Sequence, residues 1–574
     1  MKVIYKGRAS RRTNALPEDA GDVLELLSSD WNDYGYETTF VTVCRIDKER
    51  VDLGLIRVLV EGVHNTRKYF NKLLEAGWDG SFPIPDVNYV STPGEIAFYE
   101  QLQGALSKEQ ALEVADQLQD ASYLIHIKDS SEAQGLIKSK GFKDSLQRER
   151  GSIESFNDGW KILDQGSISA NDIKFGFRDV YGNQSSLNLK FSADRTLLPR
   201  EINVLIGANG TGKSQFLHQI VEAWIADGRR LRKQHTPMPE SISRLIVASY
   251  SPFELFPVDM GESKVRDRDA YRYFGLRGRA ASQPVGEQKP NVASSVSLSR
   301  EIPREDTIKS LLSCIADDQR YRHIKGWGQK IVTAIRVLRA AIDFDEMALK
   351  ITSRVNPDDL VRDGDVEAPF KEITFKKKTE VYALITSDTV NMWEHERLSK
   401  SLLASKGVVF IKGNSILALS SGQRLFAYLV LNVLGAIKRN SLILIDEPEL
   451  FLHPSLEVQL VDMLKQILNA FNSRAVLATH SVSIVREVPS DCVHVLERAE
   501  DHLVIKNPPF QTFGGDVQRI ASYVFGDKSV SKPFEQWISD RLVNMEVDEL
   551  IASLEGHINE ELIIQIHAMG ADKW

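Results

Sequence analysis

One segment of the chain has the residue types and the spacing of a phosphate-binding loop. Gly207-Ala-Asn-Gly-Thr-Gly-Lys-Ser214 matches the pattern G-x-x-x-x-G-K-[ST], with the apolar stretch Ile202–Ile206 before it and a helical pattern after it. Glycines let backbone N–H groups point at phosphate oxygens, and the amino end of the following helix adds positive potential. We predict that Lys213 binds the β- and γ-phosphates of ATP and that Ser214 binds Mg²⁺. The predicted nucleotide-binding residues are Gly207, Asn209, Gly210, Gly212, Lys213, Ser214 and Gln215.

A second apolar segment, residues 441–445, ends in two adjacent acids, Asp446 and Glu447. Side chains alternate along a strand and the chain turns at this point, so the two carboxylates can have different roles. We expect Asp446 to bind Mg²⁺ or a water of its shell, and Glu447 to activate the attacking water as general base. The alternative, a strand that merely ends in acidic turn residues, is disfavoured by the phosphate-binding loop upstream.

Two further motifs accompany the phosphate-binding loop and the acidic strand end. Leu419-Ser-Ser-Gly-Gln-Arg424 opens a helical pattern, and Ala475-Val-Leu-Ala-Thr-His-Ser481 is an apolar strand that ends at His480. In this order the motifs resemble the ABC ATPases, whose signature loop reads LSGGQ; here Ser421 replaces a glycine. The resemblance implies that His480 is a switch histidine at the γ-phosphate, and that the nucleotide lies between two copies of the chain. The signature residues that would reach the partner's γ-phosphate are Ser420, Ser421, Gly422 and Gln423.

Two features depart from transporter-type ABC proteins. Residues 249–254 contain no glutamine where a Mg²⁺-contacting one is expected, which leaves the coupling between the lobes open. The Glu447-Pro-Glu motif followed by Leu452-His-Pro-Ser-Leu456 resembles the RecF, SMC and overcoming-lysogenisation-defect branch. With Tyr271–Arg277 and Thr512–Gly526, the set is most similar to the SMC-like ATPase of Septu and some retron defence systems (PtuA-like).

This resemblance implies an ATPase subunit of an anti-phage system, which senses or controls a separate effector (a nuclease or toxin) through ATP-driven dimerisation. A RecF- or SMC-like DNA-maintenance ATPase is the alternative, and a transporter engine is disfavoured by the His-Pro loop. Clustered acids or a zinc pattern for a second catalytic centre are not found in the sequence. We therefore expect any destructive activity to belong to another chain.

The order of the patterns predicts an α/β fold, an ABC ATPase head with a P-loop sheet, a helical lobe and a helical insertion, plus a small N-terminal α+β domain. A polar linker is expected at residues 128–155. The predicted parts are an N-terminal regulatory or docking domain (1–160), ATPase lobe I with the P-loop (168–260), a mostly helical insertion (261–400), ATPase lobe II (401–525) and a C-terminal helical tail (526–574).

The insertion carries basic residues interleaved with aromatic ones between Lys264 and Arg279. Basic side chains contact phosphates and aromatic rings stack on bases, so this pattern fits nucleic-acid binding through Arg272, Arg277 and Arg279. The alternative is that the aromatic rings pack inward while the arginines are solvated or pair with acids.

Composition narrows the class of protein. The 574 residues are 42% hydrophobic and 26% charged, with a net charge of -8, so only a local patch or an assembly could bind nucleic acid. The longest apolar stretch, Phe426–Ile437, contains Asn432 and is shorter than the roughly 20 residues of a membrane span. Three scattered cysteines and no secretory segment favour a cytoplasmic protein.

Overall fold

The buried apolar segments of the sequence form one seven-stranded sheet in the order β10-β9-β18-β19-β8-β20-β21. Strands from β10 to β20 pair in parallel, and β21 runs antiparallel to β20. Parallel strands are covered on both faces, which explains their continuous apolar runs. The strands are β8 (Ile202–Gly207), β9 (Arg244–Ser249), β10 (Tyr271–Gly275), β18 (Ser441–Asp446), β19 (Arg474–Thr479), β20 (Val493–Arg498) and β21 (Leu503–Lys506).

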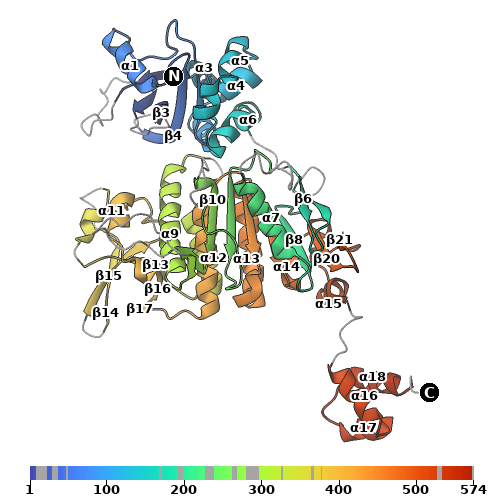
Figure 1. Cartoon of the computed structure of the whole chain (residues 1–574). Coiled ribbons are helices and arrows are strands. Elements are labelled where there is room, and N and C mark those ends of the chain that lie inside the picture. The colour runs from blue at the N-terminus through green and yellow to red at the C-terminus, as the bar shows by residue number, and fades with distance from the viewer. Residues whose placement is uncertain are drawn as a thin grey trace. The chain divides into compact units, whose positions relative to one another are not determined.

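The computed structural model describes residues 1–7, 22–28, 36–46, 49–166, 171–191, 198–226, 238–260, 268–279, 296–324, 327–353, 355–362, 368–375, 378–526 and 533–571. These residues divide into two units, Met1–Val517 and Gln518–Trp574. The fold is α/β with the ABC ATPase arrangement around the central sheet, as the sequence predicts. Figure 1 shows this sheet with helices on both of its faces.

Helix α7 (Lys213–Ile225) and the hairpin β6–β7 (Ile173–Arg178 and Gln184–Leu189) cover one face of the sheet. Phe216 on α7 packs edge-on against Phe175 and Phe177 of the hairpin, with ring centroids 5.7 and 4.9 Å apart. On the other side, α12 (Ser421–Ala436) contacts β9, and α13 (Pro454–Ala470) contacts β19. Two shorter helices follow, α14 (Val482–Val485) and α15 (Val517–Ala521).

The segment between β9 and the signature motif contains a second, antiparallel sheet in the order β14-β15-β13-β16-β17. The described part of residues 261–400 therefore holds strands that the prediction of a mostly helical insertion did not include, beside the helices α9, α10 and α11. Charged residues such as Lys371 and Glu372 on partly exposed strands hide the alternation that marks a strand. The elements are η2 (Arg268–Ala270), β11 (Arg277–Arg279), β12 (Val296–Leu298), α9 (Ile302–Arg320), α10 (Lys330–Ala341), β13 (Glu346–Lys350), η3 (Pro357–Leu360), β14 (Phe370–Phe375), β15 (Lys378–Ile385), α11 (His395–Lys400), η4 (Ala404–Lys406), β16 (Val408–Lys412) and β17 (Ser415–Ile416).

The N-terminal domain (described residues up to 166) has a five-stranded sheet and several helices. The predicted polar linker at residues 128–155 is wrong, because this segment folds into helices that bury Phe142 and Leu146. Helix α6 also buries Ser152, Glu154 and Ser155, so its inward face looks polar in the sequence. The elements are β1 (Lys2–Tyr5), β2 (Val23–Ser28), β3 (Thr39–Ile46), β4 (Glu49–Val60), α1 (Thr66–Glu75), β5 (Tyr89–Pro93), α2 (Ala97–Ala105), α3 (Lys108–Gln117), α4 (Ala121–His126), α5 (Ser131–Ile137), η1 (Phe142–Leu146) and α6 (Arg150–Gln165).

The described residues 533–571 of the C-terminal unit form the helices α16 (Pro533–Leu542), α17 (Val547–Ser553) and α18 (Glu560–Ala571). Their apolar faces meet in a small core of Ile538, Leu542, Leu550 and Ile566. All three cysteines of the chain are buried and unpaired. Among the described residues, no helix has both the length and the apolar character that a membrane crossing requires.

Phe70 tests the packing of the N-terminal domain. Its ring is fully buried and lies 5.2 to 5.8 Å from the rings of Tyr5, Phe40, Trp78 and Phe82. Phe70→Ala should lower the free energy of unfolding of this domain by about 3–5 kcal/mol, because it leaves a cavity that the neighbouring rings cannot fill. Hydrogen exchange of the β3–β4 amides measures this loss. The control is Phe253→Ala, where the side chain is 88% exposed and the cost should be below about 0.5 kcal/mol. Equal effects of the two substitutions would contradict this packing.

Candidate nucleotide site

The phosphate-binding loop lies between the end of β8 and the start of α7. Its glycines are required by geometry: Gly210 and Gly212 have φ values of +74° and +96°, and a Cβ at Gly207 would lie 2.3 Å from the Leu496 carbonyl oxygen. Lys213 is buried, and its Nζ donates hydrogen bonds to the carbonyl oxygens of Gly207 and Ala208 at 3.0 and 3.1 Å. Of the other loop residues that the sequence predicts as ligands, Asn209 and Gln215 are exposed.

Acidic side chains surround the ammonium group of Lys213. Burial lowers the Lys213 pKa, and the charges of Glu447, Glu449 and Asp446 oppose that shift. Burial also raises the pKa of Asp446 to about 7, although a hydrogen bond from Ser214 favours the carboxylate. The hydroxyl of Ser214 and the carboxyl group of Asp446, which are predicted to bind magnesium, are adjacent: Ser214 Oγ donates a hydrogen bond to Asp446 Oδ1 at 2.9 Å. A hydroxyl and one carboxylate, completed by phosphates and water, match what Mg²⁺ takes in such sites.

Glu447 follows Asp446 in an uncommon backbone conformation. Its φ and ψ are +50° and +55°, the left-handed region that non-glycine residues rarely adopt. The Glu447 amide donates to the Ala478 carbonyl oxygen at 2.8 Å, which ties this turn to the end of β19. Such strain persists where the surrounding structure fixes it, and it is concentrated at functional sites. The side chain of Glu447 is partly exposed, so water can reach it.

A third acid of the same motif, Glu449, holds the loop that carries His480. Its carboxylate accepts hydrogen bonds from Thr479 Oγ1 at 2.8 Å and from the His480 backbone amide at 2.5 Å. Burial and the positive charge of Lys213 both lower the His480 pKa, which favours the neutral imidazole. Buried Glu457 accepts a hydrogen bond from the hydroxyl of Ser481, one residue further. The sequence analysis assigned no role to Glu449. The one feature of the sequence that could have indicated its role is its place as the third acid in Asp-Glu-Pro-Glu.

The signature residues form the amino end of α12. Ser420 Oγ accepts from the Gln423 amide at 3.2 Å, and Gln423 Oε1 accepts from the Ser420 amide at 3.1 Å, a reciprocal cap. A Cβ on Gly422 would lie 2.7 Å from the Phe451 carbonyl oxygen, so the signature turn packs closely on the loop after β18. Ser420 and Ser421 are exposed, which leaves this helix end accessible to a second molecule.

The segment after β9 lacks a glutamine but contacts the signature helix by other means. Tyr250 OH accepts a hydrogen bond from Asn432 Nδ2 at 3.1 Å, and Asn432 Oδ1 accepts one from Ser310 Oγ at 2.9 Å. The single amide in the apolar face of α12 therefore joins that helix to the β9 loop and to α9. Glu254, in the same segment, is buried and accepts hydrogen bonds from Phe256 N, Tyr273 OH and Arg277.

The arginines predicted to bind nucleic acid pair with carboxylates. Arg272 contacts Asp269 at 2.7 Å, Arg277 contacts Glu254 at 3.4 Å, and Arg279 contacts Asp259 at 2.6 Å. The interleaved aromatic residues Tyr271, Tyr273 and Phe274 are buried, so they offer no surface for base stacking. This arrangement matches the alternative of inward rings and paired arginines. Lys264 and Arg266 of the same run lie outside the described residues.

The order of β18, β19 and β8 brings the ends of three strands together: Asp446 from the first, His480 after the second and Lys213 after the third. Parallel strands present their carboxyl ends, and the loops that bind ligands, at one edge. The sheet, the phosphate-binding loop and the acidic strand end define the class of the protein, a P-loop ATPase fold of the ABC-like type.

Three comparisons with known proteins show what parts of this chain are similar to. A family model described as "AAA domain, putative AbiEii toxin, Type IV TA system" matches residues 412–486, which include the signature helix, the acidic strand end and His480. Protein ea59 of Escherichia phage lambda is 23% identical over 512 residues, covering 87% of this chain and 85% of the phage protein. An SMC head bound to the C-terminal winged-helix domain of ScpA aligns with a TM-score of 0.28 and 11% identity, covering 59% of this chain and 98% of that chain. UvrA2 from Deinococcus radiodurans aligns with a TM-score of 0.27 and 12% identity, covering 70% of this chain and 42% of that chain.

Glu449→Gln tests whether this acid positions the histidine loop. The amide nitrogen of glutamine cannot accept a hydrogen bond, so either Thr479 or the His480 amide loses its partner. ATP turnover should fall by about 10-fold, in line with a lost hydrogen bond to a buried charged group, while calorimetry should show unchanged Mg·ATP affinity. The control is Glu346→Gln, which removes a 2.6 Å ion pair with Lys371 in the second sheet and should leave turnover unchanged. Wild-type turnover in Glu449→Gln would mean that other contacts hold the loop.

Proposed function

We propose that the chain is an ATPase that binds Mg·ATP at the phosphate-binding loop and hydrolyses it in a dimer. The observation that carries the proposal is the convergence of Lys213, the Ser214–Asp446 pair and the Glu449-held histidine loop at one edge of the sheet. A buried lysine among acids and backbone N–H groups is suited to a polyanion that brings its own charge-balancing cation.

Each group has a distinct role in the proposed reaction. Lys213 exchanges its two carbonyl partners for the β- and γ-phosphate oxygens, and the loop amides bind the remaining oxygens. Ser214 and Asp446 would hold Mg²⁺, which supplies charge stabilisation at the phosphates when bound. Glu447 accepts a proton from the attacking water, and His480 contacts the γ-phosphate. Glu449 acts through His480 and Thr479, as a positioning residue.

The second copy of the chain completes the proposed site. The amino end of α12 is exposed and carries a serine hydroxyl together with the helix N-terminal amides, a favourable environment for phosphate oxygens. Its reciprocal cap fixes the turn before any partner is met. ATP bound to one subunit would therefore be covered by Ser420–Gln423 of the other, which makes closure depend on nucleotide.

We further infer that this ATPase controls a separate effector in an anti-phage system. Two observations support this role: the family model matching residues 412–486 carries the name of a toxin of a toxin–antitoxin system, and the curated relative belongs to a phage. In the part of the chain that the structure describes, no three His, Cys, Asp or Glu side chains are placed together so that they could hold a metal ion. A RecF- or SMC-like DNA-maintenance ATPase would use the same nucleotide chemistry without an effector.

Glu447→Gln tests the proposed reaction and the dimer together. The substitution removes the proton acceptor but keeps the shape of the site, so ATP should still bind while turnover falls about 10²–10⁴-fold. The ATP-bound variant should elute as a stable dimer in size-exclusion chromatography with light scattering, because closure is no longer reversed by hydrolysis.

Two further variants control this experiment. Lys213→Ala should bind no ATP and remain monomeric. Ser420→Arg, placed in the Glu447→Gln background, should bind ATP as a single subunit yet form no dimer, since a long cation occupies the place of the partner's γ-phosphate. Unchanged turnover in Glu447→Gln would assign water activation to another group, and dimers of the Ser420→Arg double variant would refute the shared site.

The division of labour between this chain and an effector predicts that the isolated protein cuts no nucleic acid. Plasmid, linear DNA and RNA should stay intact with Mg²⁺ or Mn²⁺, because two-metal cleavage needs side chains that hold ions about 4 Å apart. Gel assays with the purified chain measure this, and Lys213→Ala reveals contaminating nucleases. Robust cutting by the wild-type chain would contradict the effector proposal and favour a nuclease of the overcoming-lysogenisation-defect kind.

A further inference from the structure

The signature helix and the acidic strand of the nucleotide site are joined by only four residues. Helix α12 ends at Ala436 and β18 begins at Ser441, so residues 437–440 (the connector loop) link the two elements. The signature turn lies at the other end of α12, and Asp446 lies at the other end of β18. A shift of one element relative to the other must therefore pass through the connector loop, which has little slack.

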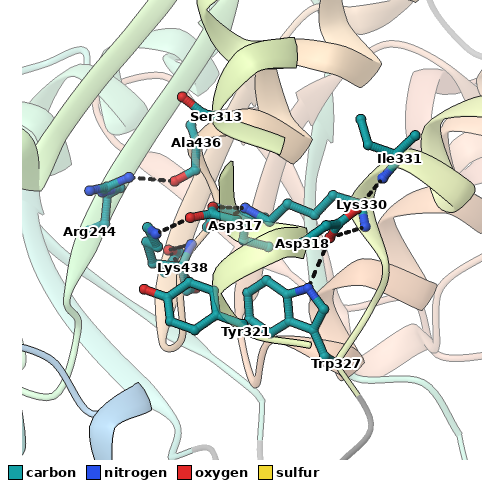
Figure 2. A network of polar contacts seen from close by, with 12 residues as sticks. Arg244, Ser313, Asp317, Asp318, Tyr321, Trp327, Lys330, Ile331, Ala436 and Lys438 are labelled. Atoms are coloured by element: carbon teal, nitrogen blue, oxygen red, sulfur yellow. Dashed lines mark hydrogen bonds and ion pairs between the residues drawn. The ribbon is translucent and has the colours of Figure 1, made fainter. Parts of the chain in front are cut away.

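One side of the connector loop is held by a buried charge cluster (Figure 2). Lys330 is fully buried, and its Nζ donates to the Ile437 carbonyl oxygen at 2.8 Å and pairs with Asp317 at 2.8 Å. Lys438 pairs with the second oxygen of Asp317 at 2.7 Å. Arg244 donates to the Ala436 carbonyl oxygen at 2.8 Å. Lys330 and Arg244 thus satisfy carbonyl groups at the end of α12, where the helix dipole favours positive charge.

The same cluster is anchored firmly to α9 and α10. Asp318 accepts hydrogen bonds from the amides of Lys330 and Ile331 at 2.8 and 2.9 Å and from Trp327 Nε1 at 2.9 Å. The two lysines keep the pKa of Asp317 well below its usual range, although its burial acts in the opposite direction. Displacement of Lys330 from Asp317 would cost free energy, because this fully buried ammonium group would lose its charge partner.

The other side of the connector loop is held by the N-terminal domain. Glu100 pairs with Arg439 at 2.7 Å, and Glu154 accepts a hydrogen bond from the side-chain amide of Asn440. Asn440 has a φ of +53°, so the loop turns in a conformation that is rare for a residue with a side chain. Helix α2 also approaches the residues after α9 closely, since a Cβ on Gly104 would lie 2.3 Å from the His323 carbonyl oxygen.

A further contact ties the N-terminal domain to the charge cluster itself. Glu95 pairs with Arg320 at 2.8 Å and accepts a hydrogen bond from Tyr321 OH at 2.7 Å. The Tyr321 ring lies 5.0 Å from Lys438 Nζ. Three acids of the N-terminal domain therefore reach the connector loop or the residues that hold it.

We propose that the N-terminal domain sets the rate of ATP turnover through the connector loop, with Glu100 as a positioning residue; this inference rests on the proposed ATPase function. By fixing Arg439 and Asn440, the domain fixes the relation between the signature helix and the strand that carries Asp446 and Glu447. A change in the domain that loosens these two contacts alters how the two halves of the shared site meet. The chemical groups around the phosphates stay in place.

The test compares Glu100→Gln with a matched control in the full-length chain. Glu37 is the control, because it pairs with Arg67 inside the N-terminal domain at 2.5 Å and its side chain is 18% exposed against 22% for Glu100. Glu100→Gln and Arg439→Gln should each lower kcat about 5-fold or more, the usual size of coupling between distant sites. The double variant should fall no further than either single one. KM and the affinity for a non-hydrolysable ATP analogue should stay at wild-type values in all of them.

Glu37→Gln should leave kcat unchanged, and melting temperatures separate coupling from simple loss of stability. Wild-type kcat in Glu100→Gln and Arg439→Gln would overturn the inference, and so would an equal loss of kcat and melting temperature in Glu37→Gln. Hydrogen exchange gives a readout that does not need turnover. Mg·ATP should increase the protection of peptides covering α2 in the wild type but not in Glu100→Gln. If the wild-type chain hydrolyses no ATP, the proposed function fails, and this exchange comparison alone decides the coupling.

Discussion

The ammonium group of Lys213 is influenced by three acids at the carboxyl edge of the central sheet, while its burial disfavours the charged form. Burial lowers the Lys213 pKa, while Glu447, Glu449 and Asp446 raise it. Charges interact strongly where water is excluded, so this balance depends on where the acids are held. Asp446 ends β18 and Glu449 contacts the end of β19, so the register of β18, β19 and β8 determines the electrostatics of the loop.

A second buried charge cluster lies at the amino end of β18, where Asp317 is shared by Lys330 and Lys438. At the carboxyl edge of the sheet, three acids act on one lysine, Lys213. In the second cluster, two lysines share one acid, Asp317. The N-terminal domain adds two ion pairs beside this cluster, Glu95 with Arg320 and Glu100 with Arg439. Strand β18 runs between these two clusters, and helix α12 runs from the signature turn to the second one, so the proposed nucleotide site and the contact with the N-terminal domain share these two elements.

Contiguous motifs were predictable from the sequence because their chemistry is local. The phosphate-binding loop needs glycines at fixed positions, and Gly207, Gly210 and Gly212 adopt the conformations that this requirement implies. Roles that depend on residues brought together by folding could not be predicted. Glu449 contacts Thr479 and His480 thirty residues away, and Glu100 contacts Arg439 across more than three hundred. Helix α6 was missed for a related reason, since its buried face carries Ser152 and Glu154, whose hydrogen-bond donors Arg57 and Asn440 lie elsewhere in the chain.

The basic and aromatic residues around β10 show how one sequence pattern admits two physical solutions. Alternation along a strand separates Tyr271 and Tyr273 from Arg272, so these two rings are buried while Arg272 is exposed. The rings pack inward, where Tyr273 donates to Glu254 and Tyr271 donates to the Pro257 carbonyl oxygen. Buried Glu254 favours inward packing over an exposed binding surface. A buried carboxylate requires hydrogen-bonding partners, and Glu254 contacts both Tyr273 and Arg277. The segment that the sequence offers as a binding surface thus anchors the loop after β9, and through Tyr250 that loop reaches Asn432 on the signature helix.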